Sequence, residues 1–247
     1  MITNLHTHTS RCNHALGEDR DYVTSALAAG IQILGFSDHS PMPFPKDYDS
    51  SRVRMAMEEF PDYCASVSAL KDEFKNDIEI RLGVELEYYP EYFGRIVKVL
   101  EKYHIEYVIL GQHFVGNEIG ERYMGTPLGI DILRRYVDQT IEGMKTGCFL
   151  YLAHPDIPNF TGDDKDYSVE MRRLCEAAEK LQIPVEINLL GMRSGRNYPD
   201  RRFWKIAGET GCRVVMGCDA HRPEDLNDPV SEKTALDMAE EFHLNLI

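Results

Sequence analysis

Seven of the nine histidines in this chain of 247 residues follow short apolar segments, in company with two carboxylates. The set is His6, His8, His14, His39, His113, His154 and His221, together with Glu85 and Asp219. Neutral imidazole and carboxylate are donors that transition metals bind in proteins. His6 and His8 are two residues apart, and such residues point to the same face of a β-strand, so both rings can approach one ion. The pattern therefore indicates a metal site.

The number of candidate ligands indicates more than one ion. A zinc ion takes about four ligands, which is fewer than this set provides. We therefore expect two or three divalent transition-metal ions, and an imidazole-rich set of donors does not choose among Zn, Fe and Mn. A carboxylate such as Glu85 can bridge two cations, which can then hold a hydroxide between them as a nucleophile.

Each of these residues also has an ordinary structural interpretation. A single histidine is more often a core or surface residue with a hydrogen-bond partner, and His104 and His243 fit that description. The joint occurrence of the others at successive strand ends favours the metal site. Cys12 and Cys218 stand beside candidate ligands, so either could be a ligand or a nucleophile, although each has a neighbour better suited to the task.

Charge and cysteine usage limit the classes of function. The net charge is −14, which argues against sequence-independent binding to nucleic acid and against docking on an anionic membrane. Six cysteines occur without a CxxC motif, which is typical of free thiols in a reducing cytoplasm. The chain shows no signal-peptide pattern and no apolar run of membrane-spanning length. We expect a cytoplasmic protein that acts on a small molecule.

The elements that must position these residues alternate between strand and helix. After a first strand that carries His6 and His8, we expect strands at Ile31–Phe36, Ile78–Glu87, Tyr107–Gly111, Phe149–Ala153, Val185–Asn188 and Arg213–Gly217. Helices are expected at Asp19–Ala29, Arg52–Lys75, Tyr92–Tyr103, Ile130–Lys145, Tyr167–Leu181, Phe203–Glu209 and Ser231–Phe242, with loops at Gly116–Gly129 and Gly191–Pro199. Seven such units, with no linker between them, favour one α/β domain over residues 1–247, a parallel barrel with its chemistry at the carboxyl ends of the strands.

Six motifs carry a resemblance to a known family. They are Leu5-His-Thr-His-Thr, Ser37-Asp-His-Ser-Pro, Gly83-Val-Glu-Leu-Glu, Gly111-Gln-His, Ala153-His-Pro and Gly217-Cys-Asp-Ala-His. In order and spacing they resemble the motifs of the polymerase-and-histidinol-phosphatase (PHP) superfamily. Arg11-Cys-Asn-His-Ala and Glu186-Ile-Asn-Leu-Leu-Gly-Met-Arg further resemble its histidinol-phosphate phosphatases.

This resemblance implies a distorted (β/α)7 barrel of the PHP type, with parallel strands, outer helices and a trinuclear metal centre. By position, the first metal is held by His6, His8, Glu85 and Asp219; the second by Glu85, His113 and His154; and the third by His14, His39 and His221. The implied activity is hydrolysis of L-histidinol phosphate to L-histidinol and phosphate, a step of histidine biosynthesis, in which a metal-bound hydroxide attacks phosphorus. The alternative is a PHP phosphoesterase that acts on nucleotides or oligonucleotide ends.

Substrate contacts are less well indicated than metal ligands. The segment after His154-Pro155 lacks the basic residue that related phosphatases tend to supply to the phosphate. We therefore expect Arg193 to bind the phosphate, with Arg196 or Lys165 in support. The resemblance and the chemistry together make Glu85, Asp219, His39 and Arg193 the expected catalytic residues. The proton donor to the leaving group stays open among Asp38, His39 and a metal-bound water, and Glu87 or Asp156 could meet the positive charge of the substrate.

Overall fold

The structure is a computed structural model that describes residues 1–247. The chain divides into two compact units, each with its own parallel β-sheet. The first unit comprises Met1–Leu86, Pro90–Ile109 and Gly217–Pro229, and the second comprises Glu87–Tyr89, Leu110–Met216 and Val230–Ile247. No helix combines the length and the apolar composition that crossing a membrane requires.

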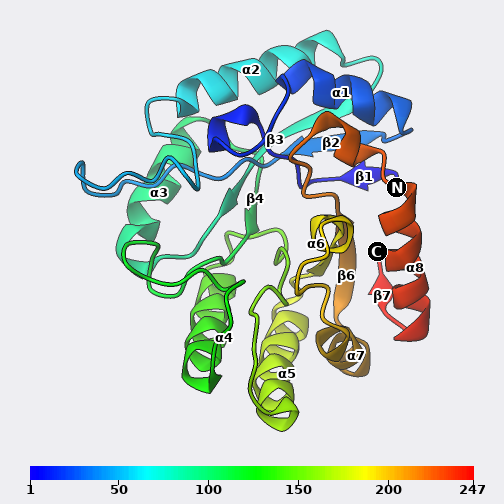
Figure 1. Cartoon of the computed structure of the whole chain (residues 1–247). Helices are drawn as coiled ribbons and strands as arrows, with labels where there is room; N and C mark the ends of the chain where they lie inside the picture. The colour runs from blue at the N-terminus through cyan, green and yellow to red at the C-terminus, as the bar shows by residue number, and fades with distance from the viewer. The chain divides into compact units, whose positions relative to one another are not determined.

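The first sheet has the strand order β1-β2-β3-β4. Its strands are β1 (Thr3–Asn4), β2 (Ile33–Phe36), β3 (Glu79–Leu86) and β4 (Tyr107–Leu110), and β2 pairs in parallel with both β1 and β3. The helices between them are α1 (Asp19–Ala28), α2 (Phe60–Glu73) and α3 (Pro90–Lys102), with the 3-10 turn η1 (Ser10–Cys12). A second 3-10 turn, η2 (Pro223–Leu226), lies in the last segment of this unit. Helices α1 and α2 lie against one another, and α2 packs on β3 (Figure 1).

Two glycines, Gly35 on β2 and Gly83 on β3, leave room for the ring of Tyr107. A Cβ atom on Gly35 would stand 2.2 Å from the Tyr107 hydroxyl, and one on Gly83 would stand 2.3 Å from its Cζ atom. The hydroxyl lies 3.0 Å from the carbonyl oxygens of both Leu5 and Phe36, beside the strand ends that lead to His6 and His39. A buried ring therefore fixes the segments that carry two candidate ligands.

The second sheet has the strand order β5-β6-β7. It consists of β5 (Val185–Asn188), β6 (Arg213–Gly217) and β7 (Asn245–Leu246). The helices are α4 (Ile130–Lys145), α5 (Asp164–Leu181), α6 (Leu189–Arg193), α7 (Arg201–Thr210) and α8 (Pro229–Glu241). Helix α5 packs between α4 and α7 (Figure 1). Asp163 and Asp200 cap the N-termini of α5 and α7 through their side chains, which satisfies backbone N–H groups there.

Most expected elements are confirmed, and four expectations are wrong in detail. The first strand, β1, ends at Asn4, so His6 and His8 follow it and do not lie on it. The segment Phe149–Ala153 is not a regular strand, because only Leu152 forms bridges, one to Leu110 and one to Val185. The helix expected from Arg52 begins only at Phe60, where Pro61 occupies the first turn and its missing N–H is of no consequence. The loop expected at Gly191–Pro199 starts inside α6, whose first turn is capped by the side chain of Asn188.

Candidate metal centre

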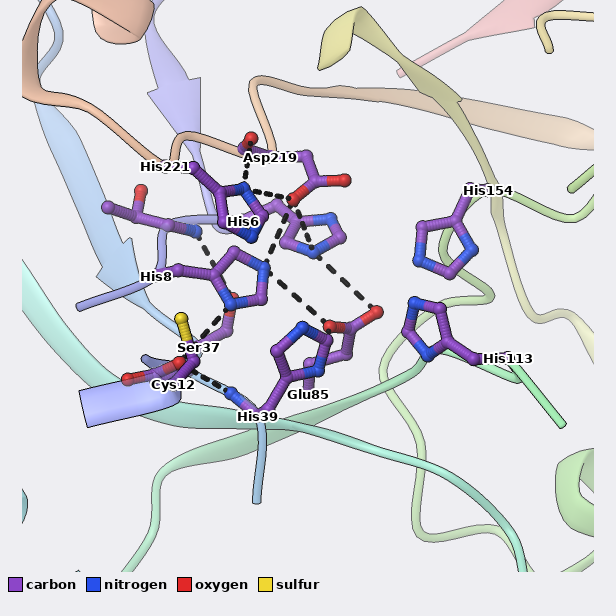
Figure 2. A network of polar contacts seen from close by, with 12 residues as sticks. His6, His8, Cys12, Ser37, His39, Glu85, His113, His154, Asp219 and His221 are labelled. Carbon is purple, nitrogen blue, oxygen red and sulfur yellow. Dashed lines mark hydrogen bonds and ion pairs between the residues drawn. The ribbon is translucent and has the colours of Figure 1, made fainter. Parts of the chain in front are cut away.

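Seven of the nine predicted ligands come together inside the first unit. They lie after β1 (His6 and His8), after η1 (His14), after β2 (His39), at the end of β3 (Glu85) and after β6 (Asp219 and His221). Figure 2 shows that the labelled side chains of this group point toward one another. The expectation that these residues converge from strand ends is met for this group.

Backbone pairing in the parallel sheet explains why these segments meet. Thr7 pairs in parallel with Ala220, and the amide of His8 donates to the carbonyl of Ala220 at 2.9 Å. His39 pairs in parallel with Glu85, and the amide of Ser40 donates to the carbonyl of Glu85 at 2.8 Å. These isolated parallel bridges lie at or just beyond the ends of the strands, and parallel strands present their carboxyl ends at one edge.

The carboxylate of Glu85 faces three imidazoles. Its Oε2 atom lies 2.9 Å from Nδ1 of His39 and 3.6 Å from Nε2 of His8. Its Oε1 atom lies 3.7 Å from Nε2 of His6. Glu85 is buried, and its two oxygens are directed at different histidines, which is the disposition that a bridging carboxylate requires.

The carboxylate of Asp219 faces two of these histidines, His6 and His8, and also His221. Its Oδ1 atom lies 3.1 Å from Nε2 of His8, 3.6 Å from Nε2 of His6 and 3.3 Å from Nδ1 of His221. Burial alone raises the pKa of Asp219, but the neighbouring His6, His221 and His8 outweigh it and hold that pKa well below its usual range. Burial alone lowers the pKa of His8, yet Asp219 and Asp38 raise it well above its usual range. The cluster therefore favours a positive charge at its centre, whether proton or metal cation.

The donor set fits transition-metal ions. Three ligand atoms lie within 4.8 Å of one another in the groups His8/His39/His221 and His6/His8/Glu85. A third group contains His14 and His221 with the thiol of Cys12. Burial, followed by the Asp38 carboxylate, raises the pKa of that thiol, and a protonated thiol is a poor ligand and nucleophile. Nitrogen and carboxylate oxygen thus dominate the donors, which suits Zn, Fe or Mn.

Asp38 is buried and contacts the Nδ1 side of the His8 ring. Its Oδ1 atom lies 3.3 Å from Nδ1 of His8, and the same oxygen accepts the amide of His39 at 2.8 Å. Its other oxygen accepts the hydroxyl of Thr9. A carboxylate on the second nitrogen of an imidazole fixes the tautomer of the ring, and this directs Nε2 of His8 into the cluster. These partners support a role in orienting His8, whereas the expected contact with substrate stays a prediction.

The second unit contains the other two predicted ligands. The ring centroids of His113 and His154 lie 4.7 Å apart (Figure 2). Nδ1 of His113 lies 3.1 Å from Oε1 of the buried Glu87, so His113 has the same kind of carboxylate partner as His8. His154 is buried and its backbone has φ of 29°, in the left-handed region that costs on the order of 1–3 kcal/mol for a residue with a side chain. The amide of His154 donates to Oε2 of Glu186 at 3.1 Å.

The two arginines expected at the phosphate occupy different environments. Arg193 lies in the last turn of α6, not on a loop as expected, and its Nη1 atom is shielded from solvent. Arg196 is exposed and donates from Nη1 to the hydroxyl of Tyr198 at 3.0 Å. Lys165 is exposed in the first turn of α5. Among the three, Arg193 is the partly enclosed cation.

Asp156, a candidate for the positive group of the substrate, is buried in the protein. Its Oδ2 atom accepts the amide of Asp200 at 2.6 Å and Nε1 of Trp204 at 2.9 Å. Burial raises the pKa of Asp156 to about 7. Neither this pairing nor the contact of Glu186 with His154 can be predicted from the sequence, because neither leaves a periodic signal.

The fold and this cluster define an α/β protein with parallel sheets and a group of imidazole and carboxylate donors that can hold metal. The sequence model of the PHP domain matches residues 4–189. The chain belongs to the PHP domain family.

Three relatives are informative. A protein from Deinococcus radiodurans named probable histidinol-phosphatase is 31% identical over 233 residues, covering 91% of this chain and 88% of that protein. A histidinol-phosphatase from Bacillus subtilis is 31% identical over 116 residues, covering 44% of this chain and 43% of that protein. The crystal structure of a histidinol phosphate phosphatase from Lactococcus lactis, in complex with zinc, L-histidinol and phosphate, superposes with a TM-score of 0.78 at 17% identity, covering 99% of this chain and 95% of that one. This likeness confirms the expected α/β fold of the PHP type.

Proposed function

We propose that this chain is a metal-dependent phosphomonoesterase that hydrolyses L-histidinol phosphate to L-histidinol and phosphate. The observation that carries the proposal is the convergence of His6, His8, Glu85 and Asp219 in the first unit, with nitrogen and oxygen atoms 3.1–3.7 Å apart. The names of the relatives from D. radiodurans and B. subtilis supply the substrate. The ligands of the L. lactis protein support the same choice of substrate and of zinc as one suitable metal.

The nine predicted ligands hold two or three divalent ions, which we assign to Zn, Fe or Mn. In the first unit, His6, His8, Glu85 and Asp219 supply one set of donors, and His14, His39 and His221 supply another. His113 and His154 are the proposed ligands within the second unit. When bound, such ions lower the pKa of a coordinated water and withdraw charge from the oxygens of a phosphate.

The chain's own residues orient the ligands and bind the substrate. Asp38 and Glu87 accept hydrogen bonds from the Nδ1 atoms of His8 and His113, so that Nε2 of each ring carries a lone pair for the metal. Arg193 binds two oxygens of the phosphate with its planar guanidinium. Nδ1 of His39 lies 2.9 Å from Oε2 of Glu85. His39, Asp38 and a water are the candidates to return the proton to the leaving alkoxide.

The test combines elemental analysis of the purified protein with a panel of phosphomonoesters. We expect more than one transition-metal ion per chain and faster phosphate release from histidinol phosphate than from nucleoside monophosphates. Equal or higher kcat/KM on nucleotides would favour the nucleotide-directed phosphoesterase instead. Full activity in rigorously metal-free protein would contradict the metal mechanism as a whole.

A further inference from the structure

We propose that Glu186 and Asn188 on β5 are positioning residues that connect the backbone of His154 to the N-terminus of α6. They thereby fix a metal ligand and the phosphate-binding Arg193 relative to one another within the second unit. The inference rests on the proposed function, in which His154 binds metal and Arg193 binds phosphate.

The first link joins Glu186 to His154. Glu186 is fully buried, and its Oε2 atom accepts the amide of His154 at 3.1 Å. His154 has the left-handed backbone conformation, with φ of 29°, which a residue with a side chain adopts only when its surroundings hold it there. A hydrogen bond from a buried amide to a carboxylate is stronger than one to a neutral acceptor. Glu186 therefore acts on the backbone from which the imidazole of His154 projects.

The second link joins Glu186 to α6 through Asn188. The side-chain amide of Asn188 donates to the same Oε2 atom of Glu186 at 3.0 Å. Its Oδ1 atom accepts the amide of Gly191 at 3.2 Å and caps α6. Helix α6 comprises only Leu189–Arg193. The same short helix therefore has Asn188 as its N-cap and carries, in its last turn, the Arg193 guanidinium that we assign to the phosphate.

The turn that follows His154 is also held by contacts that do not involve Glu186. The effect of removing Glu186 can therefore be measured without loss of the whole turn. Asp156 accepts the amide of Asp200 and Nε1 of Trp204, and the hydroxyl of Tyr136 donates to the carbonyl of Pro155 at 3.0 Å. Removing Glu186 thus leaves the turn attached to α4 and α7. We expect a local change in the geometry of His154 rather than loss of the fold.

The metal arm of the test compares Glu186→Ala with Glu186→Gln. The probe is zinc alone, titrated into metal-free protein by calorimetry. Glu186→Ala should weaken the binding of one zinc ion by about 10–100-fold, the range observed when a group that orients a metal ligand is removed. Glu186→Gln retains an oxygen that can accept both hydrogen bonds, so its zinc affinity should stay within about threefold of wild type.

A matched control separates positioning from general stability. Glu170 is a buried glutamate of the same unit, paired with Arg134 and Arg173. Glu170→Ala should lower the melting temperature and leave zinc affinity unchanged. If Glu170→Ala and Glu186→Ala lose zinc affinity to the same extent, Glu186 has only a structural role and the inference is wrong.

The substrate arm uses Asn188→Ala, which breaks the link to α6 and leaves the bond between Glu186 and His154. We expect KM for histidinol phosphate to rise about tenfold, with zinc affinity unchanged. Arg193→Ala should then cost less kcat/KM in the Asn188→Ala background than in wild type, because the two changes remove one interaction. Additive losses, or unchanged kinetics in Asn188→Ala, would refute this link.

The two arms also distinguish failure of the inference from failure of the proposed function. If the wild-type protein binds zinc but does not hydrolyse histidinol phosphate, the proposed substrate is wrong, while the zinc titration still decides the role of Glu186. If Glu186→Ala does not fold, Glu186→Gln decides that arm: a wild-type zinc affinity supports the inference, and a tenfold loss overturns it.

Discussion

Oε1 of Glu87 lies 3.1 Å from Nδ1 of His113, and the Glu87 carboxylate is buried. Glu85, two residues earlier on the same segment, faces His6, His8 and His39 instead. One strand end thus provides a carboxylate that we propose binds metal directly and another that we propose orients a metal ligand. The two glutamates should respond differently to the same substitution.

Glu87→Gln removes a negative charge from behind His113 but keeps an acceptor for its Nδ1–H. We expect kcat/KM to fall by about 10–100-fold, the usual cost of losing a group that orients a metal ligand. Steady-state kinetics with histidinol phosphate measures the loss. A wild-type rate would show that His113 does not depend on this partner.

Glu85→Gln removes the charge of the carboxylate that faces three histidines. We expect kcat to fall by at least about a thousandfold, the scale of losing a principal electrostatic element, together with loss of bound metal. Kinetics and elemental analysis of the same preparation measure both effects. Equal losses in Glu85→Gln and Glu87→Gln would contradict the assignment of different roles to the two residues.

The parts of the fold that local pattern determines could be predicted from the sequence. Helix α4 and strands β5 and β6 have the bounds that their apolar patterns and flanking residues indicate. Contacts between distant segments could not be predicted, because they leave no local signal. The placement of Tyr107 against Gly35 and Gly83 is one example.

In the candidate site too, local sequence patterns predicted some residues, whereas contacts between distant segments could not be predicted. The positions at strand ends predicted which side chains come together, and the seven predicted ligands in the first unit do converge. The side chains behind them were predicted less well, because a buried aspartate such as Asp38 looks like any other loop carboxylate in a sequence. Only the tertiary structure shows that its oxygens are occupied by His8, Thr9 and the amide of His39.

Removal of metal should abolish turnover and lower thermal stability. His6, His8, Glu85 and Asp219 are buried together, and their charges are compensated best by a cation. Prolonged dialysis against a chelator, followed by calorimetry and assay, should show both losses, and stoichiometric zinc or manganese should restore them. Unchanged melting and turnover in metal-free protein would be incompatible with this account.

Gly83→Ala tests the packing that holds the strand ends. The new Cβ atom would stand 2.3 Å from Cζ of Tyr107, so the ring must move away from its contacts with Leu5 and Phe36. We expect a loss of about 1–3 kcal/mol in the free energy of unfolding, measured by denaturant titration. Gly94→Ala is the matched control, since nothing lies within 4 Å of its Cβ position on α3, and it should stabilise by up to about 1 kcal/mol. Similar values for the two variants would refute the packing argument.

Arg193→Lys and Arg193→Ala test the substrate assignment most directly. An ammonium cannot reproduce the two parallel hydrogen bonds of a guanidinium, so Arg193→Lys should already weaken histidinol phosphate turnover markedly. Arg193→Ala should cost about 2–4 kcal/mol in kcat/KM while bound metal and folding stay intact. Arg196 is exposed and bonded to Tyr198, so Arg196→Ala should lower kcat/KM by less than Arg193→Ala does. The control is Arg172→Ala: Arg172 is partly exposed and paired with Glu209, and its replacement should leave the kinetics unchanged. An Arg193→Ala enzyme with wild-type kcat/KM would remove the phosphate contact from this mechanism, and only the metal-binding residues would retain their assigned roles.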